Sequence, residues 1–336
     1  MSLLALPLPL LGSVLGLGGL GLMWRVAATT LGMPGWIGES ILALMTLDFA
    51  LLVALHALRA LRHPATIRAE FSSPALAPFF SIFSIGGLLV AAALTPHSPA
   101  AARLLWEASV LLQLALAAVL LSRWLRGEAD PALLAPPLII PFVASLLAAL
   151  TGAPLDHPDI SWAMLGIGLL FWLPLQTLLL HRLLVGPTLP PPLRPTVMIL
   201  LAPPSVLALA LLSLEGQAGP AALACAGLAT LVAAALALKL THMAAAGFSL
   251  AWWSFTFPAC AYAVLLMQLL PARMGWGGVA IAGVALALAT GIVFRVSWGT
   301  LLWAARQGAL PPDTPHQGRP APGPWMNWVA HERAYG

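Results

Sequence analysis

The chain has 336 residues, of which 60% are hydrophobic and only 8% charged, and its mean hydropathy is +0.95. So few charges exclude a soluble globular protein, whose water-exposed surface needs about 25% charged residues. The net charge of +4 is small and dispersed, which excludes a nucleic-acid-binding surface.

Ten apolar stretches follow one another along the chain, and each is long enough to cross a bilayer, which takes about 20 residues. The first lacks a basic start and a cleavage site, so it is a span and not a signal peptide. The sequence predicts an all-α integral membrane protein, with a ten-helix domain over residues 1–305. Residues 306–336 form a cytoplasmic tail, disordered or on the membrane surface. The predicted spans are 7–28, 35–60, 76–95, 99–123, 132–152, 160–181, 193–213, 219–240, 248–270 and 276–303.

Lysine and arginine indicate the orientation. With a cytoplasmic N-terminus, eleven of them fall on the cytoplasmic side and three on the other, as the positive-inside rule requires. We therefore expect both termini in the cytoplasm. The three outer residues are Arg25, Arg103 and Arg273, and the eleven inner ones are Arg59, Arg62, Arg68, Arg123, Arg126, Arg182, Arg194, Lys239, Arg306, Arg319 and Arg333.

Proline divides the spans into two sets. Even spans mostly carry proline in the first turn, where its missing N–H costs nothing, with Pro174 as the exception. Odd spans carry proline further inside, where it kinks a helix and suits a protein-lined or watery surrounding. We predict five helical hairpins, with the odd helices kinked around a central pore and the even helices outside; kinks that serve packing alone are the alternative. The odd-span prolines are Pro9, Pro78, Pro136, Pro137, Pro141, Pro203, Pro204 and Pro258.

Small, hydroxyl-bearing and aromatic residues of the odd spans are candidates for lining such a pore. Glycines in the first span also allow close helix packing, which is the alternative for that span. The ninth span combines large aromatics with Pro258 in its first half. The candidates for pore lining are Ser13, Gly16, Ser84, Pro141, Pro203, Phe255 and Pro258.

Ionisable residues inside a membrane are costly and are candidates for function. Asp48, His56 and Arg295 lie on even spans and form a candidate intramembrane charge network, either a structural ion pair of Asp48 with Arg295 or a proton relay. Glu39 and Glu107 lie near the outer interface and can reach water there.

Nothing in the sequence indicates an enzyme. The eight histidines are scattered, and the two cysteines, Cys225 and Cys260, sit in apolar runs as small buried hydrophobes. No phosphate-binding loop and no pairing of a nucleophile with a base is legible. We therefore expect no catalytic residues, no cofactor and no metal site.

Four stretches resemble the family of tellurite-resistance/dicarboxylate transporters and plant slow-type guard-cell anion channels. The most specific is residues 248–258, which read FSLAWWSFTFP, and the others are residues 193–204, 68–74 and 16–20. The resemblance implies a homotrimer whose protomers each have a pore lined by the five odd helices. It also implies that Phe257, by its place in the Trp-x-Phe-x-Phe run, plugs that pore.

The expected function is that of an anion channel, or a channel-like anion transporter, that passes small anions passively through an aromatic-plugged pore. The alternative is a secondary transporter for proton-linked C4-dicarboxylate uptake or for efflux of sulfite- or tellurite-type species. The expected partners are chloride, nitrate or a C4-dicarboxylate, membrane lipid and two further copies of the chain, with no nucleic acid. The expected location is the bacterial inner membrane.

Overall fold

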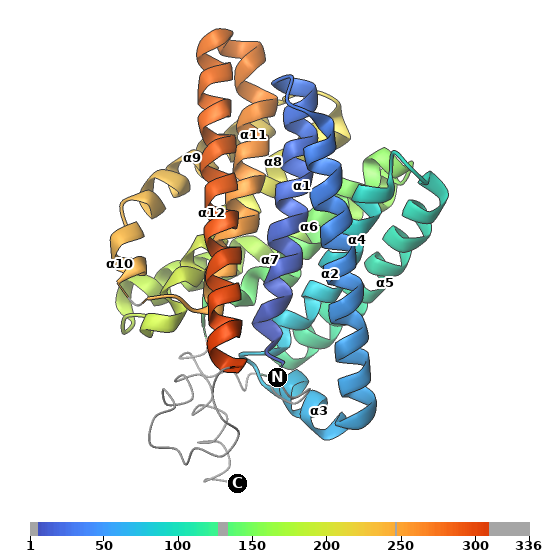
Figure 1. Ribbon diagram of the computed structural model, residues 1–336, viewed down its shortest axis with the longest axis vertical. Coiled ribbons are helices and arrows are strands. Elements are labelled where there is room, and N and C mark those ends of the chain that lie inside the picture. Colours follow the sequence, from blue (N-terminus) through green and yellow to red (C-terminus); the bar gives the residue numbers. More distant parts are fainter. Residues whose placement is uncertain (1–5, 127–133, 246, 309–336) are drawn as a thin grey trace.

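The computed structural model describes residues 6–126, 134–245 and 247–308. Every regular element within these ranges is a helix, and none is a strand (Figure 1). Ten helical stretches of the described residues are long and apolar enough to cross a membrane, so the predicted all-α membrane fold is confirmed. The tail predicted at 306–336 lies outside the described residues, except that the last helix continues to Gly308.

The even spans of the prediction are single α-helices and are called the outer spans below. Proline lies at the first position, or just before it, in four of them, where it fits the helix start. The short helices α3 (Pro64–Ser72) and α10 (Leu240–Ala244) follow the first and fourth outer spans. The outer spans are α2 (Gly35–Arg62), α5 (Pro99–Trp124), α7 (Pro158–Val185), α9 (Pro220–Ala237) and α12 (Trp276–Gly308).

The odd spans, called the inner spans, each begin as a 3-10 helix and continue as an α-helix. Prolines cluster around this change of helix type, where the lost N–H and the fixed φ of proline disfavour continuous α-helical bonding. Bending of the helices at these prolines stays a prediction. In chain order, inner spans 1, 3, 5, 7 and 9 are η2 (Leu8–Leu11) with α1 (Gly12–Thr30), η3 (Ala77–Phe80) with α4 (Ser81–Leu94), η5 (Pro136–Ile139) with α6 (Ile140–Gly152) and η6 (Ala153–Leu155), η7 (Pro191–Leu201) with α8 (Ala202–Glu215), and η8 (Leu250–Phe255) with α11 (Thr256–Met274).

The inner spans contact one another in a closed ring. Helix α1 contacts α4, and contacts then run from α4 to α6, from α6 to α8, from α8 to α11 and from α11 back to α1. The five 3-10 segments contact one another in the same cyclic order. Each outer span packs against the inner span before it, and α2, α5, α7 and α12 also contact the next inner span round the ring.

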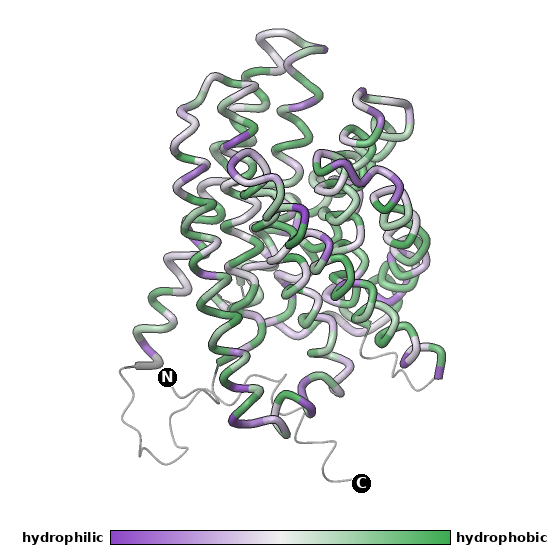
Figure 2. Tube along the Cα trace, turned by 90° about the vertical axis from the view of Figure 1, so that its right-hand side faces the viewer, coloured by the Kyte–Doolittle hydropathy of each residue, from purple (hydrophilic) through white to green (hydrophobic). Residues whose placement is uncertain are grey.

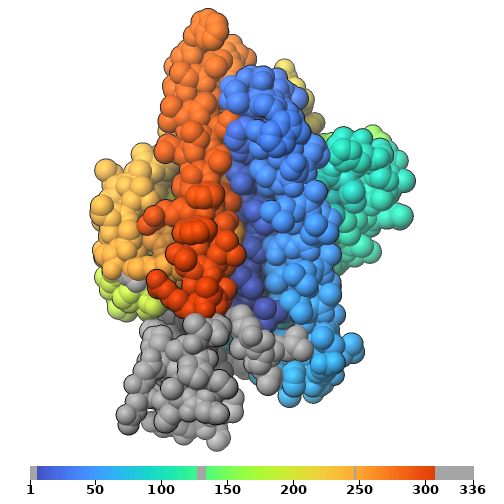
Figure 3. Space-filling view, in the orientation of Figure 1, coloured from blue at the N-terminus to red at the C-terminus, as the bar shows by residue number. Residues whose placement is uncertain are grey.

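Burial separates the two sets of spans. The buried share is 56, 72, 78, 78 and 67% in the inner spans and 22, 33, 33, 17 and 28% in the outer spans, in chain order. Large apolar side chains such as Leu47, Leu111, Leu170, Leu231 and Leu288 are exposed on the outer spans. Figure 2 shows hydrophobic residues along the length of the spans. In Figure 3, α2 and α12 cover much of the visible face of the molecule, and a strip of inner span 1 lies between them. The outer spans thus present the apolar surface that faces lipid.

Candidate functional site

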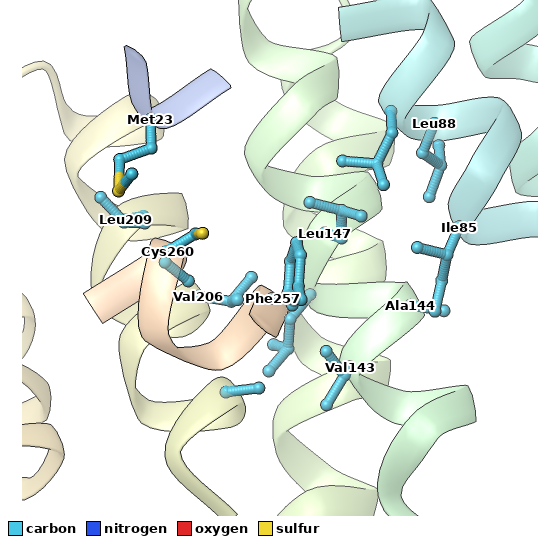
Figure 4. Packing of buried hydrophobic residues seen from close by; sticks show 14 of the residues in the cluster. Met23, Ile85, Leu88, Val143, Ala144, Leu147, Val206, Leu209, Phe257 and Cys260 are labelled. Atoms are coloured by element: carbon cyan, nitrogen blue, oxygen red, sulfur yellow. The ribbon is translucent and has the colours of Figure 1, made fainter. Parts of the chain in front are cut away.

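Phe257, the predicted plug, is a buried aromatic residue of inner span 9. It is the second residue of α11, directly after the 3-10 segment of that span, and only 7% of it is exposed. Figure 4 shows its ring between Val206 of α8 and Leu147 of α6. Met23 of α1 and Ile85 of α4 belong to the same hydrophobic core, to which all five inner spans and the buried faces of the outer spans contribute.

Glycines of α1 form the surface against which inner span 9 packs. A Cβ atom added to Gly12 or to Gly16 would lie 2.6 Å from the Trp253 side chain, and one added to Gly19 would lie 3.2 Å from Cδ2 of Phe257. Side chains at these positions would push the aromatic segment away. The first-span glycines therefore serve close packing, and this packing holds Trp253 and Phe257 in place.

Charged side chains are confined to the ends of the inner spans. The five spans, which are described in full, contain Arg25, Arg194, Glu215 and Arg273, each within a few residues of a helix boundary or a 3-10 segment. No charged residue of these spans lies beside Phe257 in sequence or in the apolar cluster. The middle of each inner span therefore carries no charged residue of its own.

Two of the predicted pore-lining hydroxyls are bound by outer spans. Ser13 Oγ donates to Asp48 Oδ2 of α2 at 2.6 Å, and Ser84 Oγ donates to Gln113 Oε1 of α5 at 2.6 Å. These hydroxyls are committed to protein partners and are not free to bind an ion. The other candidates are buried in the inner spans, and their exposure to a path stays a prediction; they are Gly16, Pro141, Pro203, Phe255 and Pro258.

The predicted charge network is not assembled. Asp48 is half-buried and bonds to Ser13, whereas the His56 Nδ1 atom lies 2.9 Å from the Leu52 carbonyl and its ring meets Phe83 edge-on. Arg295 is exposed on α12. No ion pair or hydrogen bond among the described residues joins Asp48, His56 and Arg295. Asp48 and Arg295 do not pair because α2 and α12 pack on opposite sides of α1. The depth of a residue in the membrane, which the sequence predicts, does not fix the face of the helix on which it lies.

The charged pairs that do form lie at the span ends. Arg59 of α2 is 2% exposed, and its two terminal nitrogens bond to the two carboxylate oxygens of Glu70 in α3, at 3.0 and 2.5 Å. The guanidinium of Arg123 in α5 lies 4.5 Å from the ring centroid of Phe71, also in α3. Helix α3 is thus fastened to α2 and α5. At the opposite end of α2, the Glu39 carboxylate accepts hydrogen bonds from Arg25 and lies 2.9 Å from His97 Nε2. Glu39 is therefore paired within the protein and does not simply reach into water.

The sequence prediction missed Gln113, which is fully buried on the inward face of the outer helix α5. A polar amide in the middle of an apolar span was the available signal, because such groups bond across helices in membranes. No group of three or more His, Cys, Asp or Glu residues in the described part of the chain could hold a metal ion.

Comparison with known proteins shows the family of the chain. The family model described as SLAC1, voltage-dependent anion channel, matches residues 6–301. The chain belongs to this family. The predicted resemblance is therefore confirmed, and together with the ten apolar helices it identifies a multi-pass membrane protein.

Curated relatives of the family come from a plant and a bacterium. The S-type anion channel SLAH3 of Arabidopsis thaliana is 24% identical over 310 residues, which cover 90% of this chain and 49% of that protein. The tellurite resistance protein TehA homolog of Haemophilus influenzae is 26% identical over 212 residues, which cover 62% of this chain and 64% of that protein. The chain spans about half the length of the plant relative.

Proposed function

We propose that this protein passes small anions passively across the membrane, along the axis of the five inner spans, with Phe257 as the obstruction in the path. The observation that supports the proposal is the buried Phe257 ring on inner span 9, which lies between Val206 of α8 and Leu147 of α6 inside the closed ring of inner spans. Membership in an anion-channel family supports anions as the permeating species. Electrical recording from the Phe257→Ala protein tests the proposal.

The uncharged wall favours weak ion binding. A path without fixed charges lets an ion enter and leave easily, and it favours anions that lose their water at low cost, such as nitrate over chloride. Arginines at the span ends, including Arg194 at the start of inner span 7, supply positive potential at the entrance. Chloride and nitrate are therefore the substrates of this proposal, and a C4-dicarboxylate is a larger candidate.

Proton-linked anion transport is the second candidate function. Asp48 favours it, because this carboxyl group lies mid-span, half-buried, and bonds to Ser13 of an inner span. Intramembrane carboxyl groups commonly carry protons in transporters. The name of the TehA homolog, a tellurite resistance protein, fits efflux of an oxyanion. Anion flux that moves protons and loses this coupling in Asp48→Asn would favour the transporter over the channel.

Orientation and assembly follow from the sequence and the family resemblance. The arginine distribution supports cytoplasmic termini, and we propose the bacterial inner membrane as the location. A homotrimer with one path per protomer is the assembly that the family resemblance implies. Cross-linking in native membranes tests the trimer, and protease access to tags at both termini tests the orientation.

A further inference from the structure

Gln113 of the outer span α5 joins two neighbouring inner spans through hydrogen bonds. Its Oε1 atom accepts from Ser84 Oγ of α4 at 2.6 Å, and its Nε2 atom donates to the carbonyl oxygen of Pro141 in α6. The Nε2 atom also lies 3.5 Å from Ser145 Oγ in α6. Gln113, Ser84 and Ser145 are all fully buried. One amide therefore bonds to both α4 and α6 from behind.

The orientation of this amide is determined by its partners. The Pro141 carbonyl can only accept a hydrogen bond, so the amide nitrogen must face α6 and the amide oxygen must face α4. No other residue type supplies an acceptor and two donors at this reach, since Glu lacks the donors and Asn is one methylene shorter. The bonded geometry fixes how far apart α4 and α6 stand.

The bridge joins two inner spans that lie near Phe257. Ser84 precedes Ile85 of α4, and Ser145 follows Ala144 of α6, and Figure 4 draws Ile85 and Ala144 in the same part of the hydrophobic core as Phe257. Helices α4 and α6 contact each other and both contact α5. The spacing that Gln113 sets between α4 and α6 therefore bears on the packing of the ring of inner spans near Phe257.

We propose that Gln113 is a positioning residue that holds inner spans 3 and 5 together at the depth of Phe257, and so sets the size of anion that can pass. This inference rests on the proposed function, because it assigns a width to the path between the inner spans. A similar bond in the preceding outer span supports it. Asp48 and Gln113 each lie fourteen residues after the proline at the start of their helix, Pro34 or Pro99, and each accepts a bond from a serine of an inner span.

The test compares two glutamine variants in the Phe257→Ala protein, where the current is large enough for selectivity to be measured. Gln113→Leu removes the bridge. Gln176→Leu is the matched control, because Gln176 of α7 accepts a bond from Trp172 of the same helix and its side chain has no bond to an inner span. The readout is the permeability of gluconate relative to chloride, from reversal potentials of purified protein in planar bilayers.

We expect Gln113→Leu to raise the gluconate-to-chloride permeability ratio about fivefold, the size of change that a lost hydrogen bond produces, and Gln176→Leu to leave it unchanged. A purely structural role would reduce the amount of folded protein but not alter the ratio. An unchanged ratio in conducting Gln113→Leu protein, or an equal rise in both variants, overturns the inference.

If Gln113→Leu does not reach the membrane, Ser84→Ala replaces it, because it removes the hydroxyl that Gln113 shares with the Ser81 carbonyl of the same span and leaves Gln113 in place. The expected change has the same direction and is smaller, and an unchanged ratio overturns the inference. A folded Phe257→Ala protein without current contradicts the proposed function itself, and the inference fails with it. Current in Phe257→Ala with an unchanged ratio contradicts the inference alone.

Discussion

Removal of the Phe257 ring is expected to open the path. Full burial of a Phe side chain is worth about 1.5–3 kcal/mol relative to its exposure to water. Phe257 is 7% exposed, so almost all of this free energy stabilises the ring in the obstructing position. A ring that must swing into a wet path to let an ion pass is therefore displaced in a small fraction of molecules, and Phe257→Ala should raise the anion conductance about 10- to 100-fold.

Recording from purified protein in planar bilayers measures this effect, and Phe142→Ala is its control. Phe142 is equally buried on the inner helix α6, but its ring stacks on Phe171 of the outer helix α7 at a centroid distance of 5.1 Å. Phe142→Ala should destabilise the protein by ~3–5 kcal/mol without raising the conductance. A folded Phe257→Ala protein with unchanged conductance refutes the plug, and an equal rise in Phe142→Ala shows that loosening of the ring is the cause.

Three further predictions concern packing, the buried ion pair and coupling. Gly16→Ala should lower the free energy of unfolding by ~1–3 kcal/mol in thermal melts in detergent, because the new methyl group meets Trp253. The control Gly227→Ala, at an open position, should change this free energy by less than about 1 kcal/mol. Arg59→Ala should cost ~3–5 kcal/mol in the same assay, since it leaves a carboxylate without its buried partner; a loss below about 1 kcal/mol would contradict the burial of that pair. Asp48→Asn should leave the current unchanged, because an amide oxygen still accepts from Ser13, and a lost current would favour the proton-linked alternative.

The division into inner and outer spans was predictable because it leaves a chemical trace along the chain. Outer helices carry proline mostly in the first turn, as Pro99 and Pro158 illustrate, with Pro174 inside α7 as the exception. The inner spans carry Pro141 and Pro203 at the change from 3-10 to α-helix. The ten spans were predictable for a related reason. Bilayer thickness sets the apolar length of each span independently of the others. Burial of the two sets of spans differs as that division requires.

The rotation of each helix about its own axis was not predictable from the sequence. This is why the pairing of Asp48 with Arg295 was predicted wrongly and Gln113 was missed. The depth of Asp48 and of Arg295 follows from their distance to the span ends, but the face on which each lies depends on packing between helices. Asp48 therefore bonds to Ser13, and Arg295 is exposed. Gln113 was overlooked for the same reason, because an amide in an apolar span bonds either within its own helix, as Gln176 does, or across to another.

The central claim, passive anion flux along the ring of inner spans, is tested most directly by the reversal potential of the Phe257→Ala current. Purified protein in a planar bilayer is recorded under a chloride gradient, first at equal pH and then with a proton gradient added. Passive anion flux predicts reversal close to the chloride equilibrium potential, without a shift when the proton gradient is imposed. Reversal at the cation equilibrium potential, or a shift that follows the proton gradient, would contradict it.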